Sequence, residues 1–145
     1  MTHTHTVAMV NVLFICVHNA GRSQMAEAIF NSLADGRHGA TSAGSQPAAQ
    51  VNPVVVEALK EIGIDIGGKR PKKLTADAIL GADLAITMGC GPDVCPIITG
   101  EIREWKLEDP HGKPIEEVRK IRDDIRAKVE ALVDELDQRP IPASD

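Results

Sequence analysis

The feature that most constrains the fold is a short apolar run that leads directly into a polar loop and then into a helical pattern. Residues 10–15 (VNVLFI) are predominantly apolar, which is typical of a buried β-strand. Cys16 follows at once and opens a loop that reaches Arg22 and Ser23, where a helix is expected to begin. A thiol between a strand end and a helix N-terminus faces backbone N–H groups, which bind oxyanions and favour the thiolate. The segment therefore predicts an anion cradle and a nucleophile in one place.

Strand and helix patterns alternate along the rest of the chain. We expect strands at residues 10–15, 39–42, 83–87 and 102–105, and helices at 22–33, 54–62 and 76–80. A last helix is indicated by apolar residues at three- and four-residue steps: Ile115, Val118, Ile121, Ile125, Val129 and Leu132. The alternation predicts an α/β fold, with one four-stranded parallel sheet, helices on both faces and flavodoxin-like layering.

The chain is expected to form a single catalytic domain over residues 10–137, between a flexible leader (1–9) and a flexible tail (138–145). Ligands of parallel sheets bind beyond the carboxyl ends of the strands. The loop after Cys16, the segment around Cys90 and the segment after Trp105 all follow expected strands, so they are expected to meet at one edge. Trp105 itself is expected to fill the core.

Composition narrows the classes of function. The net charge of −5 argues against a nucleic-acid surface, so an anionic substrate must be attracted locally by Arg22 and loop amides. No apolar stretch is long enough to cross a bilayer, and the N-terminus lacks an apolar signal core, so we expect a cytoplasmic protein.

The three cysteines are an odd number, which makes a static disulfide framework a poor explanation for them. Cys90 and Cys95 lie in a loop rich in glycine and proline, which suits redox exchange.

Four side chains have the chemistry that a reaction on an oxyanion requires. Arg22 carries a planar, permanently charged fork that matches two oxygens of a tetrahedral oxyanion. Ser23 is suited either to donate a hydrogen bond to the Cys16 thiolate or simply to start the helix. Asn19 has the side chain to hold the turn of the loop, or is an ordinary turn residue. Asp109, in a turn with proline and glycine, is suited to protonate a leaving oxygen, although such aspartates are also common in turns.

Together these motifs resemble the low-molecular-weight protein tyrosine phosphatases. Residues 16–23 resemble their phosphate loop, and Asp109-Pro110 resembles their general-acid motif. The fuller resemblance, over about residues 10–136, is to the thioredoxin-coupled arsenate reductases built on that fold. The other matching segments are residues 22–27 (RSQMAE), 42–44 (SAG), 52–53 (NP), 63–66 (GIDI), 82–84 (ADL), 95–96 (CP) and Trp105.

The resemblance implies reduction of arsenate to arsenite for arsenic detoxification, by a relay of three thiols. Cys16 attacks arsenic while Asp109 protonates the departing oxygen. Cys90 then attacks the Cys16 adduct and releases arsenite, and Cys95 moves the disulfide outward, where thioredoxin reduces it. Arsenate, with phosphate or sulfate as competitors, is expected in a loop made of Val17, His18, Asn19, Ala20, Gly21, Arg22 and Ser23. Relatives often carry a second cysteine at the position of Gly21.

The resemblance also bears on cofactors and partners. It implies a potassium ion beside the phosphate loop, since Asn19, Glu27, Ser42 and Asp65 match that family's ligands in type. No tightly bound cofactor is expected, because the reducing equivalents come from thioredoxin or a related reductant. We expect a monomer with no nucleic-acid or membrane partner.

Two alternatives stay open. A low-molecular-weight protein tyrosine phosphatase would use Cys16, Arg22 and Asp109 in the same way, through a phosphocysteine that water hydrolyses. The chain has no tyrosine, however, and it carries two late cysteines that a phosphatase does not need. A non-enzymatic arsenic or metal sensor could use three thiolates as ligands. That function leaves Arg22 and Asp109 without a role and lacks a basic element for binding DNA.

Overall fold

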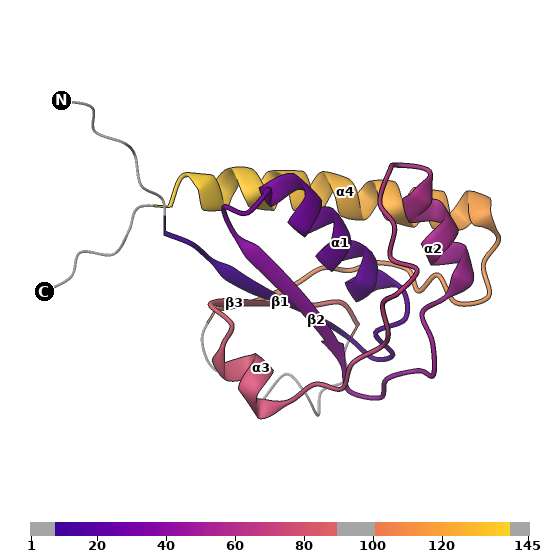
Figure 1. Cartoon of the computed structure of the whole chain (residues 1–145), viewed down its shortest axis with the longest axis horizontal. Helices are drawn as coiled ribbons and strands as arrows, with labels where there is room; N and C mark the ends of the chain where they lie inside the picture. Colours follow the sequence, from indigo (N-terminus) through magenta and orange to yellow (C-terminus); the bar gives the residue numbers. More distant parts are fainter. Residues whose placement is uncertain (1–7, 90–100, 140–145) are drawn as a thin grey trace, which may run out of the picture.

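A computed structural model describes residues 8–89 and 101–139. In chain order its elements are β1 (Asn11–Cys16), α1 (Arg22–Ala34), β2 (Gly39–Gly44), α2 (Pro53–Lys60), α3 (Ala76–Leu80), β3 (Leu84–Thr87), β4 (Glu101–Glu104) and α4 (Ile115–Asp137). The strands form a four-stranded sheet in the order β2-β1-β3-β4, and every pairing in it is parallel (Figure 1). The predicted single-domain α/β fold with a four-stranded parallel sheet is confirmed.

The sheet separates two apolar layers of unequal size. α1, α2 and α4 cover one face, and the short α3 lies on the other (Figure 1). Side chains of β1 alternate between the layers, so Phe14 packs with Phe30 and Ile125 in the larger one. Ile15 belongs to the smaller layer, where residues of α3 pack. Helices therefore lie on both faces of the sheet, as expected. Cys16 belongs to the larger layer, like Phe14, so the thiol is on the same side of the sheet as α1.

The C-terminal helix α4 carries the apolar stripe that the sequence predicts. Its stripe residues Val118, Ile121, Ile125, Val129 and Leu132 are buried, and Ile115 is partly buried against the core. Their spacing places them on one face of the helix, which packs against α1 and α2. α4 therefore supports α1 and α2, the two helices that begin beside the Cys16 loop.

Two element boundaries differ from the expected ones by two residues, and the other expected boundaries agree to within one residue. β2 extends two residues beyond Ser42, because Ala43 and Gly44 continue the parallel register with the end of β1. α2 ends at Lys60 instead of Ile62, since the following residues form a turn that closes at Gly63, whose φ is +82°. The longer β2 carries Ser42 and Gly44 up to the same sheet edge as Cys16.

Trp105 follows β4 and contributes to the core, as expected. Its ring centroid lies 5.7 Å from that of Phe14, and its side chain is partly buried against the larger layer. The aromatic contact fixes the start of the segment that leads from β4 to Asp109.

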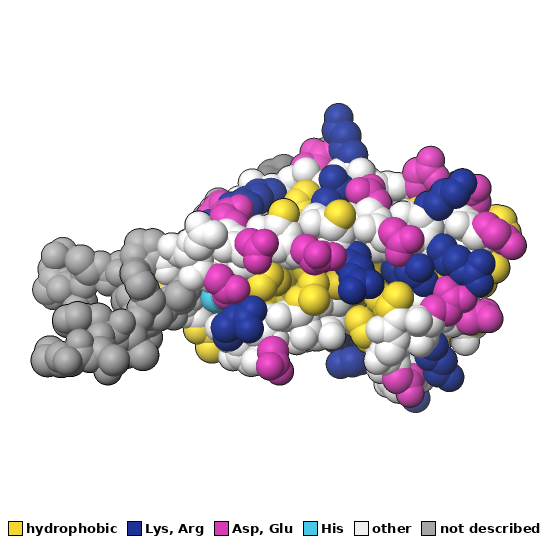
Figure 2. Space-filling view, turned by 90° about the horizontal axis from the view of Figure 1, so that it is seen from above, with side chains coloured by type: hydrophobic (Ala, Val, Ile, Leu, Met, Phe, Trp, Pro, Cys, Tyr) yellow, Lys and Arg dark blue, Asp and Glu magenta, His cyan; other side chains and the backbone are white. Residues whose placement is uncertain are grey.

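Charged side chains of both signs alternate over the face that carries the long helix. In Figure 2 the Lys and Arg side chains lie among Asp and Glu side chains and do not gather into one patch. Ion pairs join Glu61, which directly follows α2, to α4, since its carboxylate accepts hydrogen bonds from Arg119 and Arg122. Within residues 8–89 and 101–139, no helix is both long enough and apolar enough to cross a membrane.

The paired Glu61 predicts a pH-dependent contribution to stability. Its hydrogen bonds to Arg119 and Arg122 lower the pKa of Glu61 from 4.5 to about 2. A carboxyl group with a depressed pKa in the folded state stabilises that state above its unfolded pKa, and the stabilisation disappears as the pH falls towards the folded value. Glu61→Gln should therefore unfold at lower urea concentration than the parent at pH 7, and the difference should shrink between pH 4.5 and pH 2. Glu130→Gln, which removes an exposed pair within α4, is the control and should cost less. A Glu61→Gln difference that is equally large at both ends of the pH range would contradict this account.

Candidate active site

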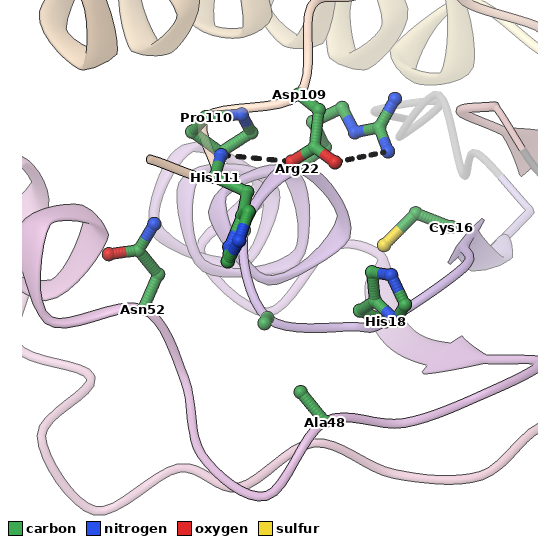
Figure 3. A pocket seen from close by; sticks show the side chains of 10 residues that line it. Cys16, His18, Arg22, Ala48, Asn52, Asp109, Pro110 and His111 are labelled. Atoms are coloured by element: carbon green, nitrogen blue, oxygen red, sulfur yellow. Dashed lines mark hydrogen bonds and ion pairs between the residues drawn. The ribbon is translucent and has the colours of Figure 1, made fainter. Parts of the chain in front are cut away.

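Cys16 ends β1 at the base of a cavity of about 230 Å³. The cavity lies beyond the carboxyl end of the sheet, at the edge where the sequence predicts a ligand site. Its wall is formed by Cys16, His18, Ala20, Gly21, Arg22, Ala48, Asn52, Asp109, Pro110 and His111. Cys16 is only 2% exposed, and its side chain points into this cavity (Figure 3).

Two hydrogen-bond donors converge on the sulfur of Cys16. The backbone N–H of Asn19 donates to Sγ at 3.2 Å, and the Ser23 hydroxyl lies 2.8 Å from Sγ. The Ser23 Oγ already accepts a hydrogen bond from the Asn19 side-chain amide. When Cys16 is a thiolate, its sulfur can only accept, and the Ser23 hydroxyl is placed to donate to it, which is the first of the two roles considered for Ser23. These two contacts hold the sulfur at the base of the cavity.

The buried side chain of Asn19 holds the loop together. Asn19 has a φ of +51°, a left-handed conformation that asparagine tolerates better than most residues. Its Nδ2 donates to the hydroxyls of Ser23 and Ser42, and its Oδ1 accepts from Gln24 Nε2 and from the Lys72 backbone N–H. The amide orientation is fixed because a backbone N–H can only donate. Of the two roles considered for Asn19, these bonds favour the one in which its side-chain amide holds the turn.

Arg22 lies at the first position of α1, with its guanidinium beside the cavity. Its side chain is 11% exposed, and Nη1 donates to the carbonyl of Leu107 at 3.3 Å. Nη2 lies 3.7 Å from the Asp109 carboxylate, which is itself half exposed. Figure 3 shows this carboxylate facing the guanidinium, with the Cys16 sulfur directed toward the same space. The nucleophile, the cation and the acid expected from the sequence thus line one cavity.

The segment that carries Asp109 packs directly on the phosphate loop. The Asp109 carboxylate accepts from the His111 backbone N–H at 3.0 Å, and the buried Pro110 ring lies over Gly21. A Cβ atom on Gly21 would lie 2.5 Å from Pro110 Cγ, closer than atoms can approach. Glycine at this position lets the acid-bearing turn sit against the loop.

Cys90 and Cys95 lie outside the described residues, but the segment that leads to them is described as far as Gly89. β3 is the neighbour of β1 in the sheet, with Thr87 in register with Ile15. Gly89 has a φ of +79°, and a Cβ atom there would lie 2.7 Å from Arg22 Nη1. The chain immediately before Cys90 therefore lies against the arginine of the phosphate loop.

Three of the four residues expected to bind potassium lie together, but they are already engaged with one another. Both acceptor positions of Asn19 Oδ1 are taken by N–H donors. Ser42 accepts from Asn19 and donates to Glu27 Oε1 at 2.6 Å. Glu27 also has two ammonium groups nearby, with Lys72 Nζ at 3.4 Å and Lys69 Nζ at 3.8 Å.

Among the described residues, the fourth one, Asp65, shares no hydrogen bond or ion pair with the other three. Its side chain is exposed, and its Oδ1 accepts from the backbone N–H of Gly67 at 2.8 Å. The Asn19 and Ser42 oxygens are engaged with N–H and O–H groups, and two ammonium groups that face the Glu27 carboxylate would repel a further cation. As arranged here, the side chains therefore do not fit a potassium ion.

Sequence reasoning missed three residues of the cavity wall: Ala48, Asn52 and His111. Asn52 is expected only as a helix cap, and it does cap α2 by accepting from the Val54 N–H. Its backbone N–H also donates to the carbonyl of Ala20, which brings it to the cavity. The sequence could have pointed to His111, because this residue directly follows the Asp109-Pro110 motif. Ala48 lies in a loop with no pattern that would mark it.

The comparisons with known proteins fit this geometry. The low molecular weight phosphotyrosine protein phosphatase family matches residues 11–93, and the chain belongs to this family of enzymes. A glutaredoxin arsenate reductase of Synechocystis sp. is 36% identical over 128 residues, which cover 86% of this chain and 97% of the relative.

Solved structures show the same similarity. The thioredoxin-dependent arsenate reductase of Corynebacterium glutamicum superposes with a TM-score of 0.76 at 41% identity, over 88% of this chain and 62% of that chain. An arsenate reductase in the phosphate binding state superposes with a TM-score of 0.78 at 33% identity, over 88% of this chain and 99% of that chain. The neighbours of this chain within the family thus include arsenate reductases.

The contact between Gly21 and Pro110 predicts a steric coupling that a double-mutant cycle measures. Gly21→Ala should lower the free energy of unfolding by about 1–3 kcal/mol, because the added methyl group overpacks against a rigid ring. In a Pro110→Ala background the same substitution should cost less than half as much, since the ring is gone. Urea unfolding of the parent, the two single variants and the double variant gives the coupling free energy between the two positions. Equal costs of Gly21→Ala in both backgrounds would mean that this contact does not position the turn.

Proposed function

We propose that this enzyme reduces arsenate to arsenite with its own thiols. The observation that supports the proposal most strongly is the single cavity lined by the Cys16 sulfur, the Arg22 guanidinium and the Asp109 carboxylate. Relatives that carry the name arsenate reductase support the choice of substrate. The sequence adds two cysteines, Cys90 and Cys95, that an enzyme of phosphate-ester hydrolysis does not require.

In the proposed complex, arsenate occupies the cavity above the Cys16 sulfur. The backbone N–H groups of residues 17–23 face its oxygens, and the Arg22 fork pairs with two of them. Phosphate and sulfate have the same tetrahedral shape, so they compete for the site. Arg22 is available for this because its ion pair with Asp109, at 3.7 Å, is long and its partner is half exposed.

The first chemical step is attack by the Cys16 thiolate on arsenic. A sulfur–arsenic bond forms and an arsenic–oxygen bond breaks, and Asp109 gives a proton to the oxygen that leaves as water. The hydrogen bonds from Ser23 and the Asn19 N–H hold the sulfur in place before attack.

The second stage moves two electrons from sulfur to arsenic. The Cys90 thiolate attacks the Cys16 sulfur, the sulfur–arsenic bond breaks, and its electron pair leaves with arsenic as arsenite. Cys95 then attacks Cys90, which frees Cys16 and forms the Cys90–Cys95 disulfide. A dithiol reductant of the thioredoxin class reduces this disulfide. The position of Gly89 against Arg22 supports the first exchange, since Cys90 is the next residue.

Thiols that must be reduced after every turnover need a reducing compartment, so we place this activity in the cytoplasm. The relay requires no metal and no tightly bound organic cofactor, because each step uses groups that belong to the chain or to its reductant.

The second candidate is phosphatase activity, which the family match itself supports. Cys16, Arg22 and Asp109 would act alike on a phosphate ester. Among the described residues, however, the cavity wall contains no phenylalanine, tyrosine or tryptophan that could stack on an aryl ring. We therefore assign phosphate-ester hydrolysis to a weak side activity.

A coupled assay separates the two functions. With thioredoxin, thioredoxin reductase and NADPH present, the enzyme should oxidise NADPH only when arsenate is added, and excess phosphate should slow it. Cys16→Ser should abolish this oxidation, because no other group can accept arsenic in the loop. The same proteins are tested with an aryl phosphate. Brisk hydrolysis of that ester, without arsenate-dependent oxidation, would overturn the proposal in favour of the phosphatase.

A further inference from the structure

A buried carboxylate lies behind the phosphate loop, and the proposed chemistry does not use it. Glu27 projects from α1, and its side chain is only 7% exposed. Burying an ionised carboxylate is costly unless it is paired and hydrogen-bonded. The charge of Glu27 therefore has to be compensated within the protein.

The compensation comes from lysines of the segment between α2 and α3. Lys72 Nζ lies 3.4 Å from Glu27 Oε1, and Lys69 Nζ lies 3.8 Å from Oε2. The Ser42 hydroxyl donates to Oε1 at 2.6 Å. Two cations and one hydroxyl thus face a single carboxylate, and Lys72 has the shorter ion pair.

The backbone of Lys72 is fixed at both of its polar groups, although its side chain is half exposed. Its N–H donates to Asn19 Oδ1 at 2.8 Å, and its carbonyl accepts from the Gly44 N–H at 2.8 Å. The first bond joins it to the phosphate loop and the second to the end of β2. The ammonium group is therefore tethered close to Glu27, which lowers the entropy lost in pairing.

A chain of hydrogen bonds with a defined direction links this ion pair to the nucleophile. An ionised Glu27 can only accept, so Ser42 donates to it and must accept from the Asn19 amide. The second amide proton of Asn19 goes to Ser23, which leaves the Ser23 proton for the Cys16 sulfur. The Lys72 backbone N–H sets the orientation of the Asn19 amide, and the Glu27 carboxylate takes the Ser42 proton, so the chain of hydrogen bonds runs in one direction from the ion pair to Cys16.

We propose that the Lys72 ammonium is the resident cation of this site and that it acts as a positioning residue for Cys16, so that the loop needs no potassium. The proposal rests on the part of the proposed function that makes Cys16 the nucleophile, and it does not depend on the identity of the oxyanion. It accounts for the misfit between potassium and these side chains, because the protein carries the positive charge itself.

The test is the rate at which iodoacetamide alkylates Cys16 in the full chain at pH 7, followed by peptide mass analysis. The parent should react equally fast in potassium chloride and in choline chloride of the same ionic strength. Lys72→Met should react about threefold more slowly in choline, the scale expected for loss of a half-exposed ion pair. Lys72→Arg should keep most of the parent rate, since the cation is conserved.

Lys73→Met is the matched control. Lys73 is the next residue and is exposed, and the described part of the chain gives it no ion pair, so its removal should leave the rate unchanged. Faster alkylation of the parent in potassium than in choline would overturn the proposal, and this comparison does not depend on any variant folding. A Lys72→Met rate equal to the parent rate would overturn it as well. Because the assay contains no arsenate, its result is independent of whether the enzyme turns arsenate over.

Discussion

The side-chain amide of Asn19 is the interaction on which the rest of the site depends. It is buried, and its hydrogen bonds reach the start of α1 at Ser23, β2 at Ser42 and the segment before α3 at Lys72. The same residue donates its backbone N–H to the Cys16 sulfur. One residue thus ties three segments to the nucleophile. Such a network is costly when any member loses its partner, and in the described part of the chain no buried side-chain nitrogen or oxygen lacks one.

The parallel sheet explains how distant segments supply one reaction. Because β1, β3 and β4 run in the same direction, the Cys16 loop, the chain at Gly89 and the turn at Asp109 all leave the sheet at one edge. Two glycines allow these segments to touch, Gly21 beneath Pro110 and Gly89 beside the Arg22 guanidinium. The chain as a whole is negatively charged, so the affinity for an oxyanion is local and comes from the loop and its arginine.

Strong local patterns made most of the fold predictable. The run at β1, the apolar stripe of α4 and the Asn-Pro start of α2 each have a direct physical signature. The end of α2 was placed two residues too late, because a local turn that closes at Gly63 follows Lys60. The loop residues and Asp109 were predictable from their spacing and family resemblance. The pairing of Glu27 with Lys72 was not, because residues 67–73 have no periodicity and only the folded chain brings the lysine to α1. Potassium was expected at this place because the residue types match its ligands. Residue types alone do not show that two lysines already face the Glu27 carboxylate.

The central claim is that arsenic is reduced by thiols of this chain in a fixed order. The most direct measurement is a single turnover of the Cys95→Ser variant with arsenate and no other reductant, quenched in acid and mapped by peptide mass. The account predicts about one arsenite per chain and a disulfide between Cys16 and Cys90. The parent, treated in the same way, should instead contain the Cys90–Cys95 disulfide. Recovery of free thiols at all three positions, with arsenate unchanged, would contradict the account.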